Sequence, residues 1–455
     1  MKSASRRLKI ALAVSLPWGG IAATAAVAHA EPPPAAEPPP AADAPPPAPP
    51  EPPLPPPPPA PMAIAPAARP PAAAPAQLKI DLPNGTNIRL GVLFQPQYQL
   101  LSFNNRDGYS SDFFVHRTRL LVGGTVLGAF DYFLDTEFAN IGIATATAGT
   151  DAMMMATSNA RKTIPGMNLL DVLVTWKALG DQFKVDVGYM LPPLGHNAVQ
   201  GAGTLFGLDY YAYSFGLHNA AFSQNPAATG ANPAAAGVVP GTTSTGRDVG
   251  VQLRGLVVGG MLEYRVGAFQ GIRTAATADN ALSSNMPRIT ARLQLNLMDA
   301  EPGFFYAGTY LGKKKIVSFG AAFDYQKAVT SSSFDDAYHM FALDGFVDLP
   351  VGGGVLTVQD DFMGWHGGML LPGLPKWTNT IEAGFTVLDF NISPVVRYER
   401  AWGDFVTQNR FSGGLAFWPF GHNANVKVFY SRLNVDNPML RGVNQVNAQL
   451  QLYFF

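Results

Sequence analysis

The end of the chain, residues 446–455, alternates between apolar and polar side chains and finishes on aromatic residues. Successive side chains of a strand point to opposite faces, so a strand here has one oily face and one wet face. Backbone N–H and C=O groups cannot stay unpaired in lipid, and strands therefore cross a membrane only inside a closed barrel. The pattern predicts an all-β chain that forms a transmembrane antiparallel β-barrel.

Segments with the same alternation occur throughout the chain from residue 78 onward. Each is about the length that a tilted strand needs to cross a bilayer, and barrels of this kind have even strand numbers. We therefore expect about sixteen strands. They fall at residues 89–98, 113–126, 129–139, 169–178, 182–191, 247–257, 260–270, 286–298, 315–326, 338–349, 354–363, 378–388, 389–399, 409–418, 423–433 and 444–455.

The connections between these segments alternate in length. Every second connection is tight, and the connections between these run from several residues to several dozen. This alternation is typical of a barrel with short periplasmic turns and long outer loops. One connection, residues 299–314, is too long for a simple turn on the periplasmic side. The tight connections lie at residues 127–128, 179–181, 259–260, 351–353, 388–389 and 420–422.

The longest connection, residues 192–246, is the third on the outer side. A barrel of this size leaves an aqueous lumen, and a loop that folds inward narrows it. We expect the aromatic part of this loop, with Tyr210, Tyr211 and Tyr213, to be ordered and to lie in or near the pore as a constriction. These rings could stack on sugars or aromatic solutes, and packing of the loop against the wall is the simpler alternative.

The N-terminal residues divide into two segments ahead of the barrel. Residues 1–30 are typical of a secretory signal peptide, with a basic start, an interrupted apolar stretch and an Ala28-His29-Ala30 cleavage site. Residues 31–77 are almost all Pro and Ala, which prevents regular helix or sheet and favours polyproline II segments. We interpret them as a periplasmic linker, with contact to peptidoglycan as the alternative. Residues 78–455 form the predicted barrel domain.

The composition narrows the classes of function. Mean hydropathy is +0.08, charged residues make up 14% of the chain, and Cys is absent. The 31 basic and 32 acidic side chains nearly balance, so nothing indicates a nucleic-acid partner. No G-x-S-x-G or H-E-x-x-H motif occurs. We therefore expect no enzyme, no catalytic or metal-binding residues and no cofactor.

The wet faces of the segments carry charges of both signs. Arg117 and Arg119 share one face opposite acidic residues of the next strand. They create either a transverse field in the lumen or a cross-strand salt-bridge network, and the network is the interpretation we favour. A second group lies on three consecutive strands with only Glu263 close by, and its guanidinium groups suit bidentate binding of phosphate or carboxylate. This candidate anion-attracting stripe, for which wall scaffolding is the alternative, consists of Arg254, Arg265, Arg288 and Arg292.

Two stretches of the chain, residues 114–139 and residues 303–320, carry a family resemblance. The first has a basic strand, a tight turn and an acidic return strand, and the second is Gly- and aromatic-rich and runs through Lys313-Lys314-Lys315 into the next strand. The first resembles the same motif of the phosphate-selective porin O and P family, and the second resembles that family's segment entering the second half of the barrel. The resemblance extends from about residue 85 to the end and implies a trimeric, sixteen-stranded porin. The terminal aromatic of the family pattern matches Phe454, which leaves Phe455 as an extra residue.

Together these observations predict a bacterial outer-membrane porin through which small hydrophilic solutes diffuse passively, with its N-terminal arm in the periplasm. Its expected partners are outer-membrane lipid, small ions or polar solutes, and further copies of itself in a homotrimer. The resemblance implies anions such as phosphate. The alternatives are a general or weakly cation-preferring porin and a mainly structural protein tethered through residues 31–77.

Overall fold

The computed structural model describes residues 78–103, 108–143, 167–213, 246–271, 286–331, 334–366, 376–403, 407–436 and 442–455. The predicted signal peptide (1–30) and linker (31–77) lie outside the described residues, as does the part of the longest connection that spans residues 214–245. No helix within the described residues is long and apolar enough to cross a membrane.

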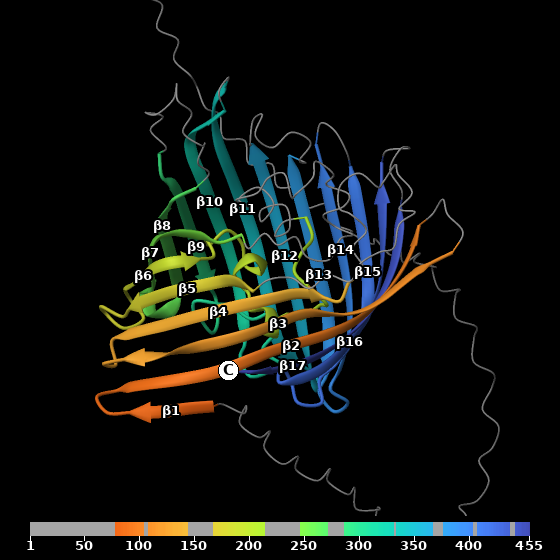
Figure 1. Ribbon diagram of the computed structural model, residues 1–455, viewed down its shortest axis with the longest axis horizontal. Coiled ribbons are helices and arrows are strands. Elements are labelled where there is room, and N and C mark those ends of the chain that lie inside the picture. The colour runs from red at the N-terminus through yellow and green to blue at the C-terminus, as the bar shows by residue number, and fades with distance from the viewer. Residues whose placement is uncertain are drawn as a thin grey trace, which may run out of the picture. The chain divides into compact units, whose positions relative to one another are not determined.

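The strands of the described chain form one antiparallel sheet, and sixteen of them, β2 to β17, close into a barrel (Figure 1). The strand bounds are β1 (Leu78–Leu82), β2 (Thr86–Phe103), β3 (Ser110–Val126), β4 (Phe130–Ile141), β5 (Asn168–Trp176), β6 (Lys184–Met190), β7 (Asp248–Val257), β8 (Leu262–Phe269), β9 (Arg288–Asn296), β10 (Ile316–Ser331), β11 (Phe334–Val351), β12 (Gly354–His366), β13 (Trp377–Val387), β14 (Ile392–Trp402), β15 (Gln408–Phe417), β16 (Ala424–Val435) and β17 (Val443–Phe454).

The barrel closes where its first and last strands meet. β17 pairs with β2, with Asn444 opposite Ser102 and Phe454 opposite Val92. Each of the strands β2 to β17 therefore has a hydrogen-bonded neighbour on both sides. This closure removes the open edges that a sheet otherwise presents, and it confirms the predicted all-β barrel of sixteen strands.

The barrel wall has its apolar side chains outside and its polar side chains inside, the reverse of a water-soluble protein. β9 is an example. Arg288 and Arg292 point inward and are 0% and 2% exposed, whereas Leu293 points outward and is 54% exposed. The period of two along a strand places one set on each face. The outer face is thus an apolar band, and the inner face carries the polar and charged side chains.

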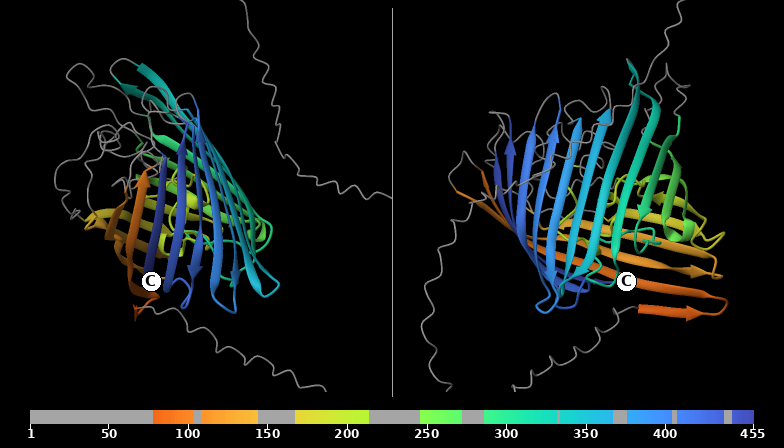
Figure 2. Two further views of the ribbon diagram at one scale, coloured as in Figure 1. Left: turned by 90° about the vertical axis from the view of Figure 1, so that its right-hand side faces the viewer. Right: turned by 180° about the vertical axis from the view of Figure 1, so that it is seen from behind.

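Tight turns join alternate pairs of strands at one end of the barrel, which we call the turn end, and the opposite end is the loop end. The turns lie at the six predicted positions. Gly352 and Gly353 have φ of 53° and 83°, as the two-residue turn between β11 and β12 requires. Figure 2 shows β11 to β16 side by side from behind, with their turns at one end.

Two features of the fold differ from the prediction. β10 and β11 extend to Ser331 and from Phe334, so the expected longer connection between residues 326 and 338 is wrong. The additional strand β1 pairs with the start of β2, in line with the end of β17. A turn at Asn84 and Gly85, both with positive φ, returns the chain from β1 into β2. This Asn-Gly pair is the sequence signal that could have predicted the hairpin.

The sidedness of β9 predicts the effect of a charge on its outer face. Because Leu293 faces outward near the middle of the strand, Leu293→Arg should lower the free energy of unfolding in lipid vesicles by about 2–4 kcal/mol. Leu293→Met is the matched control and should change it little. Urea titration of protein folded into vesicles measures both, and equal stabilities would contradict an outer face in lipid.

Candidate functional site in the barrel interior

The described part of the longest connection, residues 191–213, folds into the barrel, and we call it the lumen loop. It contains the short 3-10 turns η1 (Asn197–Val199) and η2 (Ala202–Thr204). Its apolar side chains Leu194 and Phe206 are fully buried. A loop that enters the interior of a porin-sized barrel reduces the open cross-section, so this segment is the first component of the site.

Cations of the wall hold the backbone of the lumen loop. The Lys427 ammonium donates to the carbonyl oxygens of Leu205 and Gly207, both at 2.7 Å. The Arg397 guanidinium donates to the carbonyl oxygen of Asp209 at 2.8 Å. These charge-assisted bonds satisfy loop carbonyls that are buried away from strand partners.

The side chain of Asp209 ties the same loop to β3. Its carboxylate accepts from Arg117 Nη2 at 2.5 Å and lies 3.0 Å from His116 Nε2. Burial opposes ionisation of Asp209, but Arg117 and His116 outweigh it and hold the pKa of its carboxyl well below its usual value. Arg119 pairs with Glu137 at 2.9 Å across the β3–β4 pair. The two arginines thus belong to a salt-bridge network of the wall, and Arg117 also anchors the lumen loop.

The three tyrosines of the lumen loop lie inside the barrel and pack against its wall. The Tyr210 hydroxyl donates to the carbonyl oxygen of Gln200 at 2.8 Å. The Arg397 guanidinium lies over the Tyr211 ring, 4.8 Å from its centroid. Tyr211 and Tyr213 are each 1% exposed. In this geometry the rings hold the loop in place, and those of Tyr211 and Tyr213 present no open stacking surface.

The over-long connection between β9 and β10, residues 297–315, also enters the interior, from the turn end. We call it the turn segment. The carbonyl oxygen of Pro302 accepts from Arg254 Nη1 at 3.2 Å, and that of Phe304 accepts from Arg265 Nη1 at 2.9 Å. The unexpected length of this connection therefore has a structural reason, because it forms a second inward segment opposite the first.

The lumen loop and the turn segment are bonded to each other. Tyr306 N–H donates to the carbonyl oxygen of Val199, and Gly201 N–H donates to that of Tyr306, both at 3.0 Å. His196 Nε2 lies 2.9 Å from Glu301 Oε2 in a fully buried contact. Two connections from opposite ends of the barrel thus interlock inside it.

Each arginine of the predicted anion-attracting stripe has an acidic partner and is almost fully buried. The expectation that only Glu263 lies nearby is wrong, because neighbouring strands bring further carboxylates to the inner face. The pairs are Arg254–Asp186 at 2.8 Å, Arg265–Glu263 at 2.7 Å, Arg288–Asp324 at 2.6 Å and Arg292–Asp344 at 2.8 Å. Wall scaffolding therefore describes these contacts better than an open anion path.

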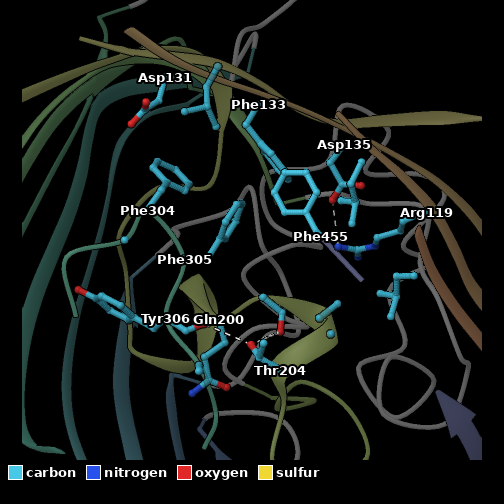
Figure 3. Close-up of a pocket in the computed structure, with 18 of the residues that line it drawn as sticks. Arg119, Asp131, Phe133, Asp135, Gln200, Thr204, Phe304, Phe305, Tyr306 and Phe455 are labelled. Atoms are coloured by element: carbon cyan, nitrogen blue, oxygen red, sulfur yellow. Dashed lines mark hydrogen bonds and ion pairs between the residues drawn. The ribbon is translucent and has the colours of Figure 1, made fainter. Parts of the chain in front are cut away.

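A cavity of about 470 Å³ lies between the two inward segments and the wall formed by β2 to β7. Its upper part in Figure 3 is lined by the rings of Phe133, Phe304, Phe305 and Phe455. These rings are half-buried and meet edge to face, with centroids 4.9 Å apart for Phe304–Phe305 and 5.5 Å apart for Phe133–Phe305. These rings therefore present aromatic surface to open space inside the barrel.

The last residue of the chain belongs to this cavity. β17 ends at Phe454, in agreement with the predicted barrel terminus, and the ring of Phe455 turns inward to lie 5.4 Å from that of Phe133. A Cβ at Gly91 or Gly123 would fall 2.7–2.8 Å from the Phe455 side chain, so both glycines leave room for it. The extra residue of the sequence is thus a component of the interior.

Two titratable groups of the connections stabilise the interlock. Burial disfavours the charged form of Glu301, but His196 and the Tyr310 hydroxyl outweigh it and lower the pKa of its carboxyl. Burial lowers the pKa of His422 to about 4, so the neutral ring can hydrogen-bond the carbonyl oxygen of Thr309 at 2.9 Å. Among the described residues, no group of three or more acidic or His side chains could hold a metal ion.

Sequence reasoning singled out Arg117, Arg254 and Arg265, but not the aromatic residues of the cavity or the other two cations, Lys427 and Arg397, that hold the lumen loop. The available signal was the over-long connection together with its Gly303-Phe304-Phe305-Tyr306 sequence, since aromatic residues are rare in a solvated turn. No comparable pattern marked Lys427 or Arg397, because their partners are backbone carbonyls that carry no sequence signature.

The buried ion pairs predict a large difference between interior and surface substitutions. Asp344→Asn leaves the Arg292 charge uncompensated, and it should lower the free energy of unfolding by about 3–5 kcal/mol. Lys177→Gln is the matched control, because the Lys177–Asp131 pair is partly exposed and should contribute less than about 1 kcal/mol. Urea titration in lipid vesicles measures both, and similar losses would contradict a dry interior pair.

The lowered pKa of Glu301 predicts how the interlock responds to acid. A carboxyl whose pKa is lowered by folding stabilises the fold above its unfolded pKa of about 4.3, and this contribution disappears as pH falls through the lower folded value. Glu301→Gln should therefore be less stable than the parent protein at neutral pH, and the gap should shrink on acidification below about pH 4.3. Urea midpoints of the two proteins across pH measure it. A gap that does not change with pH would show that the charge of Glu301 has no role.

The chain is similar in structure to several bacterial outer-membrane proteins. No family model matches it, and no curated protein matches it. OprB of Pseudomonas putida aligns with 82% of this chain and 94% of its own at 9% identity, with a TM-score of 0.51. The outer membrane channel DcaP of Acinetobacter baumannii aligns over 82% and 99% at 12% identity, with a TM-score of 0.49. Salmonella typhi OmpF aligns over 82% and 100% at 11% identity, also with a TM-score of 0.49. At 9% identity the similarity to OprB is one of fold.

Proposed function

We propose that this protein is a porin of the bacterial outer membrane, a passive channel for small hydrophilic solutes. The observation that carries the proposal is the reversed wall of a closed sixteen-stranded barrel, with apolar side chains outside and polar side chains inside. Lipid solvates the outer band, and only water or polar solutes suit the inner face. Barrels of this kind commonly enclose an aqueous channel.

The inward segments support a channel for small solutes. The lumen loop is held by Lys427, Arg397 and Arg117, and the turn segment is bonded to it from the other end. A solute that crosses the barrel has to pass between these segments and the wall. Size exclusion by two anchored segments is therefore part of the proposal.

Weak ion selectivity agrees better with the ion pairs of the wall than a strong preference for anions does. Each arginine of the predicted stripe is paired with a carboxylate, which cancels most of its field in the channel. This pairing favours a general porin over one that prefers anions. Preference for phosphate stays a prediction that rests on the family resemblance.

Three further parts of the proposal concern the chain outside the barrel wall. We propose that residues 1–30 direct export, that residues 31–77 form a periplasmic arm, and that three copies associate in the outer membrane. The arm and the signal rest on the composition of those residues, and the trimer rests on the resemblance. A contact between the arm and peptidoglycan is the structural alternative.

Planar bilayers test the channel. The purified protein should conduct KCl and give a zero-current potential near zero under a KCl gradient, with no block by millimolar phosphate. Asp209→Ala should raise the single-channel conductance, because it releases the lumen loop from Arg117 and His116. Asp81→Ala, which removes an exposed pair of β1, is the matched control and should leave the conductance unchanged.

The outcomes separate the alternatives. Absence of conductance in correctly folded protein would overturn the channel and favour the structural role. A chloride-selective potential with phosphate block would instead support the phosphate prediction. An unchanged conductance in Asp209→Ala would remove the lumen loop as the constriction.

A further inference from the structure

We propose that the interior cavity binds small carboxylates that carry an aromatic ring. The inference rests on the proposed function, since it names a class of solute for the same channel. It is argued from the surface of the cavity, where aromatic rings and one uncompensated cation lie side by side.

The rings supply a surface for a flat apolar group. Phe304, Phe305, Phe133 and Phe455 follow one another in edge-to-face contact along the cavity (Figure 3). They are half-buried, so part of each ring remains uncovered. Contact of this apolar surface with water is unfavourable. A ligand ring that covers it buries apolar area and makes aromatic contacts, and both favour binding.

The cation stands at the end of this row of rings. The Arg89 guanidinium lies 4.9 Å from the centroid of Phe455. Arg119 and Arg254, which also line the cavity, are paired with carboxylates. Within the described part of the chain, Arg89 has no such pair, so its charge is available to a carboxylate whose ring lies on the phenylalanines.

The size of the cavity fits the same class of ligand. Its volume of about 470 Å³ is within the range of small-molecule sites and exceeds what a single phosphate ion needs. A bare inorganic anion would contact Arg89 and leave the rings uncovered, whereas a neutral aromatic molecule would leave Arg89 unpaired. A benzoate-like solute uses both.

Calorimetric titration of the full chain in detergent tests the inference, with benzoate, acetate and benzyl alcohol as probes. Benzoate should bind at least about tenfold more tightly than acetate or benzyl alcohol. Arg89→Gln and Phe305→Ala should each weaken benzoate binding by about tenfold. Arg400→Gln and Phe420→Ala, both on exposed side chains outside the cavity, are the matched controls and should leave benzoate binding unchanged.

Equal binding of benzoate and acetate would overturn the proposal, as would benzoate binding that does not change in Arg89→Gln. The probe series on the parent protein decides the question even if a variant fails to fold. Conductance in KCl is measured on the same preparation without a probe. A protein that conducts but does not prefer benzoate refutes only this inference, and one that binds benzoate without conducting refutes only the channel.

Discussion

Cations of the wall that donate to backbone carbonyls determine the interior of this barrel. Lys427 holds two carbonyls of the lumen loop, and Arg265 holds those of Gly303 and Phe304 in the turn segment. An irregular segment away from water must find partners for its backbone, and a desolvated cation must find acceptors. In this barrel the carbonyls of the inward segments accept from the wall cations, so each group supplies the partner that the other needs. The inward segments and the inner charges of the wall therefore depend on one another.

Because of this dependence, the charged side chains inside the barrel cannot be treated as free charges of a channel. Side chains that sequence alone places in a channel are engaged with carboxylates or carbonyls, so their number says little about which ions the channel prefers. What distinguishes one region from another is the exception to the pairing. Among the described residues, Arg89 has no carboxylate partner, and it adjoins the row of phenylalanines.

The wall could be predicted from the sequence because alternation is local. The period of two fixes which side chains of β9 point inward, and the tight turns fix where strands end. The partners of the arginines could not be predicted, since Arg292 meets an aspartate 52 residues away through the register of intervening strands. The path of the lumen loop could not be predicted either, because it depends on backbone carbonyl groups, which every residue carries. Aromatic content drew attention to Tyr210, but it could not predict the contact of its hydroxyl with the carbonyl oxygen of Gln200.

The interlocked segments also have a mechanical consequence. A thin tube resists stretching along its axis far better than flattening across it. The lumen loop leaves the wall between β6 and β7 and is fastened to β3, β14 and β16, while the turn segment meets it from the other end. Together they act as a transverse brace. Flattening a barrel braced in this way would require these contacts to break or to shift.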